Sequence, residues 1–408
     1  MQRRFVTEIK IGLLWHSSNS GNLGVGALTV GNMAIIREVA ASLGLVPRFT
    51  IFGSADTGPA YIDDVEVFPL TARTMLDPRG FGQRVGQLDC VLDIGGGDSF
   101  TDIYPLKRFA WIVLTKVVVI NRGVPLIFSP QTIGPFLGGT AAKRALGRLA
   151  AWTVRRARQV VVRDDQSIAA VRTLVREVEP VFAVDVAFAL PWTPAPCSTG
   201  RPRIGLNVSG LLWQGGHTGR NEFNLGYDYK TLMIGVIEHL LAAKAYTVEL
   251  ICHVNAPHSL AESDGAVADK LAAHYPKLVR VADFTSPSAA KSHISGLDLL
   301  IGARMHACIA AFSSGVPVVP ISYSRKFEGL FGSLIYKRLV PCTGMTTVAA
   351  KVFVIDAIGQ REDLKNEVAD GLKQVSARLD TYRAVLHRLF TDITLQKNML
   401  GGPSKLSV

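Results

Sequence analysis

Short apolar runs alternate with helix-length segments along most of the chain. The runs cover residues 9–15, 48–52, 90–97, 125–131 and 159–163 in the first half, and 203–209, 247–254, 279–283, 297–302 and 316–322 in the second. Between them, segments such as 27–43 and 229–243 have the length of crossover helices. Strands that alternate with helices are typical of parallel sheets in α/β proteins. The pattern therefore predicts two α/β units, one after the other.

The alternation is interrupted by residues 191–203 (PWTPAPCSTGRPR), which hold four prolines and so favour a linker. We expect an N-terminal Rossmann-like domain over residues 1–195 and a C-terminal one over 203–345. We expect residues 346–408 to form a C-terminal helical segment. Its apolar side chains recur at spacings of three and four, a pattern that predicts one long amphipathic helix. Two doubly wound domains of this kind would face a cleft and bind a ligand at the carboxyl ends of their strands.

Composition narrows the class of protein. Of the 408 residues, 48% are hydrophobic and 19% are charged, which excludes extended disorder and coiled coil. The longest apolar run, residues 109–120, is interrupted by Lys116, and the N-terminus lacks a secretory signal. We therefore expect a cytoplasmic protein without a membrane span. The five cysteines are scattered without CxxC spacing, so we expect neither a disulfide framework nor a zinc site.

The formal net charge of +11 points to an acidic partner. Basic residues gather within about twenty positions of helical character: Lys143, Arg144, Arg148, Arg155, Arg156, Arg158 and Arg163. This cluster fits a solvated helix face, a surface for an anionic lipid-linked substrate or membrane, or a nucleic-acid surface. Because no nucleic-acid-binding motif accompanies the cluster, we do not expect nucleic acid as a partner.

Two glycine-rich segments follow predicted strands in the N-terminal half. The first, SGNLGVG, places Gly24 between a strand and a helix, and its GxxGxG spacing fits neither a dinucleotide fingerprint nor a Walker loop. It fits either an anion-binding turn or a tight turn that needs small residues. The second, GGGDSFTD, has three consecutive glycines, Gly95, Gly96 and Gly97, which favour a loop facing a ligand. Asp98 and Asp102 would then lie at the mouth of the cleft, where a carboxylate could bind a sugar hydroxyl or act as a base. The alternative is that these two residues cap the following helix.

Two further strands also end in polar groups at the expected active edge, in SPQTIGPF with Gln131 and in VVRDDQS with Arg163. The guanidinium of Arg163 can bind a carboxylate or phosphate in bidentate fashion. The alternative is a structural ion pair with Asp164 or Asp165.

The densest constellation is residues 297–331, where a predicted strand leads to Arg304, Met305 and His306 at a helix start. The next strand returns to Ser322 and Lys326. A helix N-terminus beside these cations predicts an anion pocket, in which His306 is the candidate general acid or base. His16 and His253 are weaker candidates. No clustered histidine or carboxylate pattern suggests a metal, and we expect no cofactor.

In this order, the segments GNLGVGAL, GGGDSFTD, SPQTIGPF, VRDDQS and IGARMHACIAAFSSGVPVVPISYSRKFEGLF resemble the polysaccharide pyruvyl transferase family, from about residue 11 to 330. The last block is the most specific. One departure is that Val25 stands where the family usually has an aspartate, as GNxGD. If the family's aspartate contacts the donor or the acceptor, this chain must make that contact with another residue or prefer a different acceptor.

The resemblance implies a GT-B-like fold and a reaction in which phosphoenolpyruvate gives its pyruvyl group to two hydroxyls of a sugar as a ketal, with loss of phosphate. It implies that Arg163, Arg304 and Lys326 hold the donor, that Met305 and Ser322 border it, and that His306 transfers protons. The N-terminal domain would bind the saccharide acceptor. This acceptor is either free or lipid-linked, and a lipid-linked acceptor would place the protein at the inner face of the membrane.

We also expect aromatic residues between positions 213 and 229, above all Trp213 and Tyr227, to stack on the acceptor, with core packing as the alternative reading. Two other functions stay open at this point. One is a GT-B glycosyltransferase that uses a nucleotide sugar, and the other is a non-catalytic module that binds acidic glycans or nucleic acid.

Overall fold

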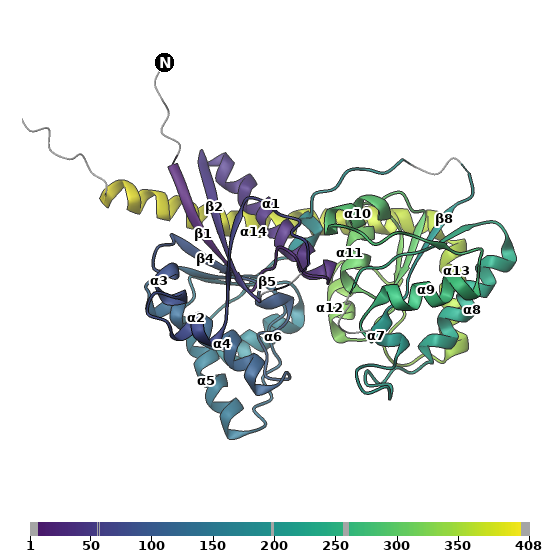
Figure 1. Cartoon of the computed structure of the whole chain (residues 1–408), viewed down its shortest axis with the longest axis horizontal. Coiled ribbons are helices and arrows are strands. Elements are labelled where there is room, and N and C mark those ends of the chain that lie inside the picture. The colour runs from purple at the N-terminus through teal and green to yellow at the C-terminus, as the bar shows by residue number, and fades with distance from the viewer. Residues whose placement is uncertain (1–6, 55, 57, 197–199, 256–260, 401–408) are drawn as a thin grey trace, which may run out of the picture.

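The computed structural model describes residues 7–54, 56, 58–196, 200–255 and 261–400. Two parallel sheets lie side by side, one in each half of the chain (Figure 1). The first has the order β3-β2-β1-β4-β5-β6-β7 and the second β10-β9-β8-β11-β12. Every pairing within them is parallel. The predicted α/β class with two doubly wound units is confirmed.

The elements of the first half follow the predicted alternation. Its strands are β1 (Thr7–Leu14), β2 (Leu45–Gly53), β3 (Val65–Pro69), β4 (Cys90–Asp93), β5 (Leu126–Gln131), β6 (Gln159–Val162) and β7 (Val181–Phe182). Its helices are α1 (Leu23–Ser42), α2 (Ala72–Leu76), α3 (Phe81–Val85), η1 (Gly95–Gly97), α4 (Leu106–Asn121), α5 (Ala141–Arg156), α6 (Asp165–Leu174) and η2 (Val186–Ala189), of which η1 and η2 are 3₁₀ turns.

The second half repeats this plan with a smaller sheet. Its strands are β8 (Arg203–Asn207), β9 (Thr247–Leu250), β10 (Val279–Arg280), β11 (Leu299–Gly302) and β12 (Val318–Pro320). Its helices are α7 (Gly210–Trp213), α8 (Tyr229–Ala243), α9 (Asp264–His274), α10 (Pro287–Ile294), α11 (Met305–Ser313), α12 (Arg325–Ser333), α13 (Thr347–Gly359) and α14 (Arg361–Leu400).

Side-chain alternation in the strands puts apolar groups on both faces of the first sheet. Leu13 and Leu92 join the core that α1, η2, α11 and α14 cover. Leu14 and Val91 join a second core beneath α3, α4 and α5. Strands buried on both faces are expected for a parallel sheet between two helix layers. The first of these cores continues into α10 and α11, so apolar packing joins the two halves.

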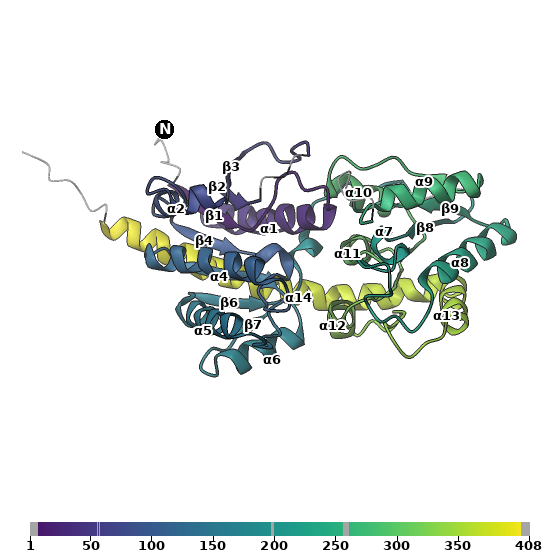
Figure 2. The ribbon, with the colours of Figure 1, turned by 60° about the horizontal axis from the view of Figure 1, so that its bottom comes forward.

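The long helix α14 runs along both halves of the molecule (Figure 2). Near its start, Leu364 packs in the core of the second sheet. Further along, the Tyr382 hydroxyl lies 2.9 Å from Asn32 Oδ1 and 3.0 Å from Ser129 Oγ in the first half. The predicted amphipathic helix is therefore present, preceded by α13, and residues 401–408 of the predicted segment lie outside the described residues.

The linker predicted at residues 191–203 follows the last strand of the first sheet along the chain and leads into the first strand of the second. Its residues 197–199, which include Cys197, lie outside the described residues. The other four cysteines are free thiols. Among the described residues, α1 is the one helix that is long and apolar enough to cross a membrane. Because 72% of its apolar window is buried inside the protein, α1 is a core helix that covers one face of the first sheet.

Candidate functional site

A cavity of about 150 Å³ lies where the carboxyl edges of the two sheets meet. Loops that follow β1, β4 and β6 border it on one side, and loops that follow β9, β11 and β12 border it on the other. Its lining residues are Asn22, Val25, Gly96, Gly97, Asp98, Arg163, His253, Arg304, Met305, His306, Tyr323, Ser324, Lys326 and Phe327. The fold thus brings together predicted site residues that are up to 230 positions apart in the sequence, from Gly96 to Lys326.

His306 lies in the first turn of α11, directly opposite the glycine-rich turn that opens α1. A methyl group on Gly24 would come within 2.4 Å of the imidazole Nδ1, so only glycine lets the turn approach this closely. The imidazole Nε2 lies 3.6 Å from Asp185 Oδ2. This nitrogen is buried and has no hydrogen-bond partner within the described residues. His306 is therefore positioned against a carboxylate with one nitrogen uncommitted.

Asp185 is fully buried and is shared between His306 and Arg163. The Arg163 guanidinium donates from Nη1 to Asp185 Oδ2 and from Nε to Thr132 Oγ1 at 3.1 Å. Burial alone would raise the pKa of Asp185, but Arg163 and then His306 outweigh it and lower this pKa to about 2. Asp185 is thus ionised at neutral pH. The structure pairs Arg163 with Asp185 instead of Asp164 or Asp165, the partners of the alternative structural ion pair.

On the opposite side, Asp264 holds the loops of the second sheet around Arg304. Its Oδ1 accepts from Arg304 Nε at 3.0 Å and Nη2 at 2.9 Å, and from the Gly210 backbone at 3.0 Å. Its Oδ2 accepts from the backbone N–H groups of His253 and Val254, both at 3.1 Å. Because the carboxylate is buried and fully engaged, it fixes the Arg304 guanidinium at the cavity wall.

Two helices point their N-termini into the cavity. The N-cap residues Arg304 of α11 and Ser324 of α12 both line it, and neither makes a side-chain capping hydrogen bond. The first N–H groups of a helix, together with its dipole, attract anions. Two such ends beside Arg304 and Lys326 make the cavity suited to a small anion.

Lys326 and Asp98 form an ion pair that joins the two sheets' loops across the cavity. The Asp98 carboxylate also accepts from the Tyr104 hydroxyl at 2.9 Å. Burial lowers the pKa of Lys326 to about 8, so part of its charge is sensitive to pH in the physiological range.

The GGG loop needs glycine for two physical reasons. All three glycines have positive φ, at 53°, 60° and 92°. A Cβ on Gly95 would also come within 2.3 Å of Gln131 Oε1, and one on Gly97 within 2.9 Å of Leu28 Cδ1. Gln131 lies beneath this loop and donates to Asp93 Oδ2 at 2.9 Å, and Asp93 also binds Lys116 at 2.9 Å. A buried polar network thus supports the loop.

Several predicted residues lie elsewhere. Asp102 is buried away from the cavity mouth, and its carboxylate accepts from the backbone N–H groups of Leu137 and Gly138 at 2.8 and 2.6 Å. Ser322 is buried and donates to the Ser324 carbonyl at 3.1 Å, so it supports the loop behind the cavity. Neither side chain lines the cavity, because both are buried in hydrogen-bonded loops outside it.

The aromatic residues chosen for the acceptor lie on the second half of the chain. Tyr227 is only 5% exposed, and its hydroxyl donates to the Ser322 carbonyl at 3.1 Å. Tyr227 thus packs largely in the core of the second sheet, at the edge of a separate cavity that Trp213 also lines, and its role as an acceptor residue stays a prediction. Trp213 is half-buried beside the same cavity and also stays a prediction as an acceptor residue.

Sequence reasoning missed Asp185 and Asp264, which organise the two halves of the cavity. The signal for Asp185 was a lone carboxylate in the apolar stretch VFAVDVAFAL, while Asp264 gave none beyond its place at a helix start. Of the weaker histidine candidates, His253 lines the cavity, and burial, with smaller contributions from His306 and Arg304, lowers its pKa to about 3. Among the residues that the structure describes, no group of three or more His, Cys, Asp and Glu side chains could hold a metal.

The architecture matches solved structures of the GT-B class over nearly the whole chain. A putative UDP-N-acetylglucosamine 2-epimerase from Listeria monocytogenes superimposes with a TM-score of 0.53 at 12% identity, covering 98% of this chain and 100% of that one. An α,α-trehalose-phosphate synthase (UDP-forming) from Burkholderia vietnamiensis superimposes with a TM-score of 0.52 at 10% identity, covering 95% and 97%. At such identities the likeness establishes the fold, which is that of GT-B glycosyltransferases and epimerases.

A family model narrows this class. The polysaccharide pyruvyl transferase model matches residues 33–325, and the chain belongs to that family. The turn with Gly24 and Val25 precedes the matched segment, whereas Arg163, Arg304 and His306 lie inside it. A search of curated proteins found no match.

Proposed function

We propose that this transferase moves the pyruvyl group of phosphoenolpyruvate to a sugar of a polysaccharide or its precursor, forming a ketal and releasing phosphate. The observation that carries the proposal is the cavity between the sheets, where His306, Arg163, Arg304 and Lys326 meet the N-termini of α11 and α12. Phosphoenolpyruvate carries a phosphate and a carboxylate on three carbons and needs two neighbouring anion sites. Membership of the pyruvyl transferase family supports the same choice.

The charges around the cavity suggest how the donor binds. Arg163 and Arg304 each have a buried carboxylate partner, so both are preorganised but only partly available to a ligand. Lys326 is the cation whose partner, Asp98, lies across the cavity on the other domain. We propose that Lys326 exchanges Asp98 for the donor phosphate at the N-termini of α11 and α12. Arg163 then receives the donor carboxylate on the N-terminal side.

In the proposed reaction, His306 donates a proton to the methylene carbon of the donor, and the electron pair of the double bond forms the new C–H bond. The adjacent carbon gains oxocarbenium character. One sugar hydroxyl attacks this carbon and gives its proton to the neutral imidazole. The C–O bond to phosphate then breaks, phosphate leaves with the electron pair, and the second hydroxyl adds while its proton goes to phosphate.

The role of Asp185 in this reaction is to hold the imidazole ring of His306 in place. It is ionised at neutral pH, and its carboxylate faces Nε2 of the imidazole at 3.6 Å. A carboxylate behind a histidine fixes the orientation of the ring. No metal or redox cofactor takes part in the proposed steps.

The partners and the location follow from the donor. Phosphoenolpyruvate is a cytosolic metabolite, so we propose a cytoplasmic enzyme whose saccharide acceptor is free or lipid-linked. Cations of the predicted basic cluster are exposed on α5, namely Arg144, Arg148, Arg155 and Arg156. They support contact with an anionic membrane face. Flotation with anionic vesicles, but not with zwitterionic ones, is the expected result, reduced when these arginines are replaced by glutamine.

Phosphate release tests the proposed chemistry. The protein should release phosphate from phosphoenolpyruvate only when a sugar acceptor is present, and His306→Gln should abolish most of this release. His387→Gln is the matched control, because His387 is an exposed histidine on α14. Release of UDP or GDP from nucleotide sugars instead would identify a glycosyltransferase. Saccharide binding without release of either product would identify a binding module.

A further inference from the structure

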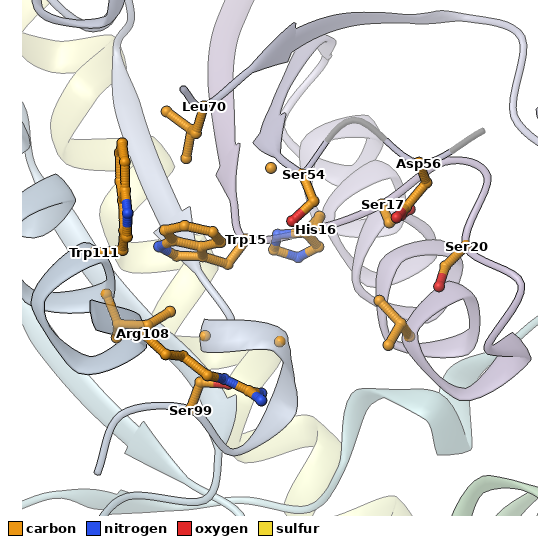
Figure 3. Close-up of a pocket in the computed structure, with 15 residues that line it drawn as sticks. Trp15, His16, Ser17, Ser20, Ser54, Asp56, Leu70, Ser99, Arg108 and Trp111 are labelled. Atoms are coloured by element: carbon orange, nitrogen blue, oxygen red, sulfur yellow. The ribbon is translucent and has the colours of Figure 1, made fainter. Parts of the chain in front are cut away.

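A second cavity lies within the N-terminal half, at the carboxyl edge of β1, β2 and β4 (Figure 3). Its volume is about 430 Å³, larger than the first cavity. It lies at the point where the order of the first sheet reverses, between β1 and β4. Ligands of doubly wound sheets bind at such switch points. None of the residues chosen for the acceptor from the sequence borders it.

Two indole rings dominate one side of this cavity. Trp15 follows β1 and Trp111 lies on α4, and both rings border the open space beside Arg108 (Figure 3). One threonine ties them together, because Trp15 Nε1–H donates to Thr115 Oγ1 at 3.0 Å and this hydroxyl donates to the Trp111 carbonyl at 2.9 Å. The orientation of the Trp15 ring relative to α4, which carries Trp111, is therefore fixed before any ligand binds.

Trp15 is held in an unfavourable backbone conformation. Its φ of 60° lies in the left-handed region, where a bulky side chain is rare. Residues held against such strain cluster at binding sites and active sites. The fold retains a tryptophan where glycine would relieve the backbone, and the ring it keeps there borders the cavity.

The polar groups of the cavity complement the rings. Asp56 accepts from the Ser17 hydroxyl at 2.5 Å, and Arg108 donates from Nη2 to the Ser99 hydroxyl at 2.5 Å. One carboxylate and one guanidinium leave the cavity without a strong charge of either sign. A pyranose ring has an apolar C–H face that stacks on indole and hydroxyls that bind carboxylate and guanidinium. The lining thus fits a neutral sugar better than an anionic ligand.

The two cavities adjoin each other. Val25 and Gly96 line both of them, so a ligand in one lies beside a ligand in the other. Val25 is the position where the family resemblance leads one to expect an aspartate. A valine here puts an apolar wall between the cavity that contains His306 and the one that contains the indoles.

We propose that the acceptor sugar binds in this second cavity, stacked against Trp111 and Trp15, with its reacting hydroxyls directed past Val25 toward His306. This inference rests on the proposed function, because it takes the first cavity as the donor site. It keeps the sequence-based expectation of an acceptor site on the N-terminal domain, but replaces the expected stacking residues, Trp213 and Tyr227, by Trp111 and Trp15.

Binding of simple glycosides to the intact protein tests the proposal. The probes are methyl glycosides of glucose, galactose, mannose and N-acetylglucosamine, titrated by NMR, and phosphoenolpyruvate is titrated separately by calorimetry. Trp111→Ala should weaken glycoside binding at least tenfold and leave donor affinity within twofold. The matched control is Trp152→Ala, since Trp152 is a half-buried tryptophan on α5 outside both cavities. Arg108→Gln, at an exposed side chain, provides a second variant if Trp111→Ala does not fold.

Three outcomes would overturn the proposal. They are glycoside binding that is unchanged in both variants, binding lost in Trp213→Ala but kept in Trp111→Ala, and absence of any glycoside binding to the wild-type protein. Failure of the proposed donor looks different: glycosides would bind in a Trp111-dependent manner while phosphoenolpyruvate does not bind at all. That result supports the saccharide site and rejects the donor assignment.

Discussion

Replacing Arg163 by methionine tests whether this arginine holds a buried carboxylate, binds the donor, or does both. Arg163 is 3% exposed and Asp185 is fully buried, so methionine leaves a charged group in the interior with only His306 nearby. Removing one partner of a buried ion pair costs about 3 to 5 kcal/mol of folding free energy. The shift in the pKa of Asp185 from 3.8 to about 2 corresponds to about 2 kcal/mol, which is smaller than that range because the cost of burying the carboxylate opposes the attraction of the two cations.

The sign of the pH dependence follows from the same shift. In the wild-type protein the pKa of Asp185 is lower in the folded state, so its contribution is complete above about pH 4 and is lost as the pH falls toward 2. Without Arg163, burial is the dominant influence on Asp185 and raises its pKa in the folded state above its pKa in the unfolded state. The variant then loses stability as the pH rises through that new value. The difference in unfolding free energy between wild type and variant should therefore be larger at about pH 7.5 than at about pH 4.5.

Urea unfolding at both pH values, on Arg163→Met and on Arg163→Met combined with Asp185→Asn, measures these terms. We expect the double variant to regain most of the lost stability, because no unpaired charge is left. Its affinity for phosphoenolpyruvate, measured by calorimetry, should stay at least tenfold weaker if Arg163 also binds the donor. Full recovery of donor affinity would show that Arg163 acts only through Asp185. An unfolding midpoint that does not change in Arg163→Met would refute the electrostatic reasoning.

Three further substitutions test the cavity. His306→Gln should lower kcat by about 10² to 10⁴ while the affinity for phosphoenolpyruvate changes little, and turnover within a few-fold of wild type would reject proton transfer by this residue. Gly24→Ala should lower kcat at least tenfold at unchanged melting temperature, because its methyl group would come within 2.4 Å of His306 Nδ1; Gly147→Ala, with nothing within 4 Å, is the control. Donor affinity should fall as the pH rises through about 8, where the charge of Lys326 is lost, and Lys326→Met should remove this dependence; a Lys326→Met profile that keeps the wild-type slope contradicts the assignment.

Much of the fold could be predicted from the sequence, because strand and helix periodicity are local properties of the chain. The helix predicted at 229–243 is α8 (Tyr229–Ala243), and the amphipathic pattern from Leu364 onward is α14. The predicted membership of the pyruvyl transferase family is confirmed. Short elements such as β3 and α2 were missed, since they are largely exposed and so lack a marked apolar pattern.

The candidate site was also predicted only in part from the sequence. The sequence by itself singled out Arg163, Arg304 and His306, because strand ends and helix starts of a doubly wound fold converge on one edge, and the structure places all three at one cavity. Only the tertiary structure decided their partners. Asp185 and Asp264 lie 22 and 40 positions from the arginines that they bind, and no local pattern encodes such a contact.

The direction of a side chain in a loop was likewise beyond the sequence. Tyr227, in a loop, and Trp111, on α4, are both aromatic residues near polar ones, yet Tyr227 is almost fully buried while Trp111 is only half-buried and borders the cavity beside Trp15. Whether an aromatic ring is covered depends on which distant segments lie over it. Periodicity thus determined the elements of this protein, and long-range packing determined which of their side chains can meet a ligand.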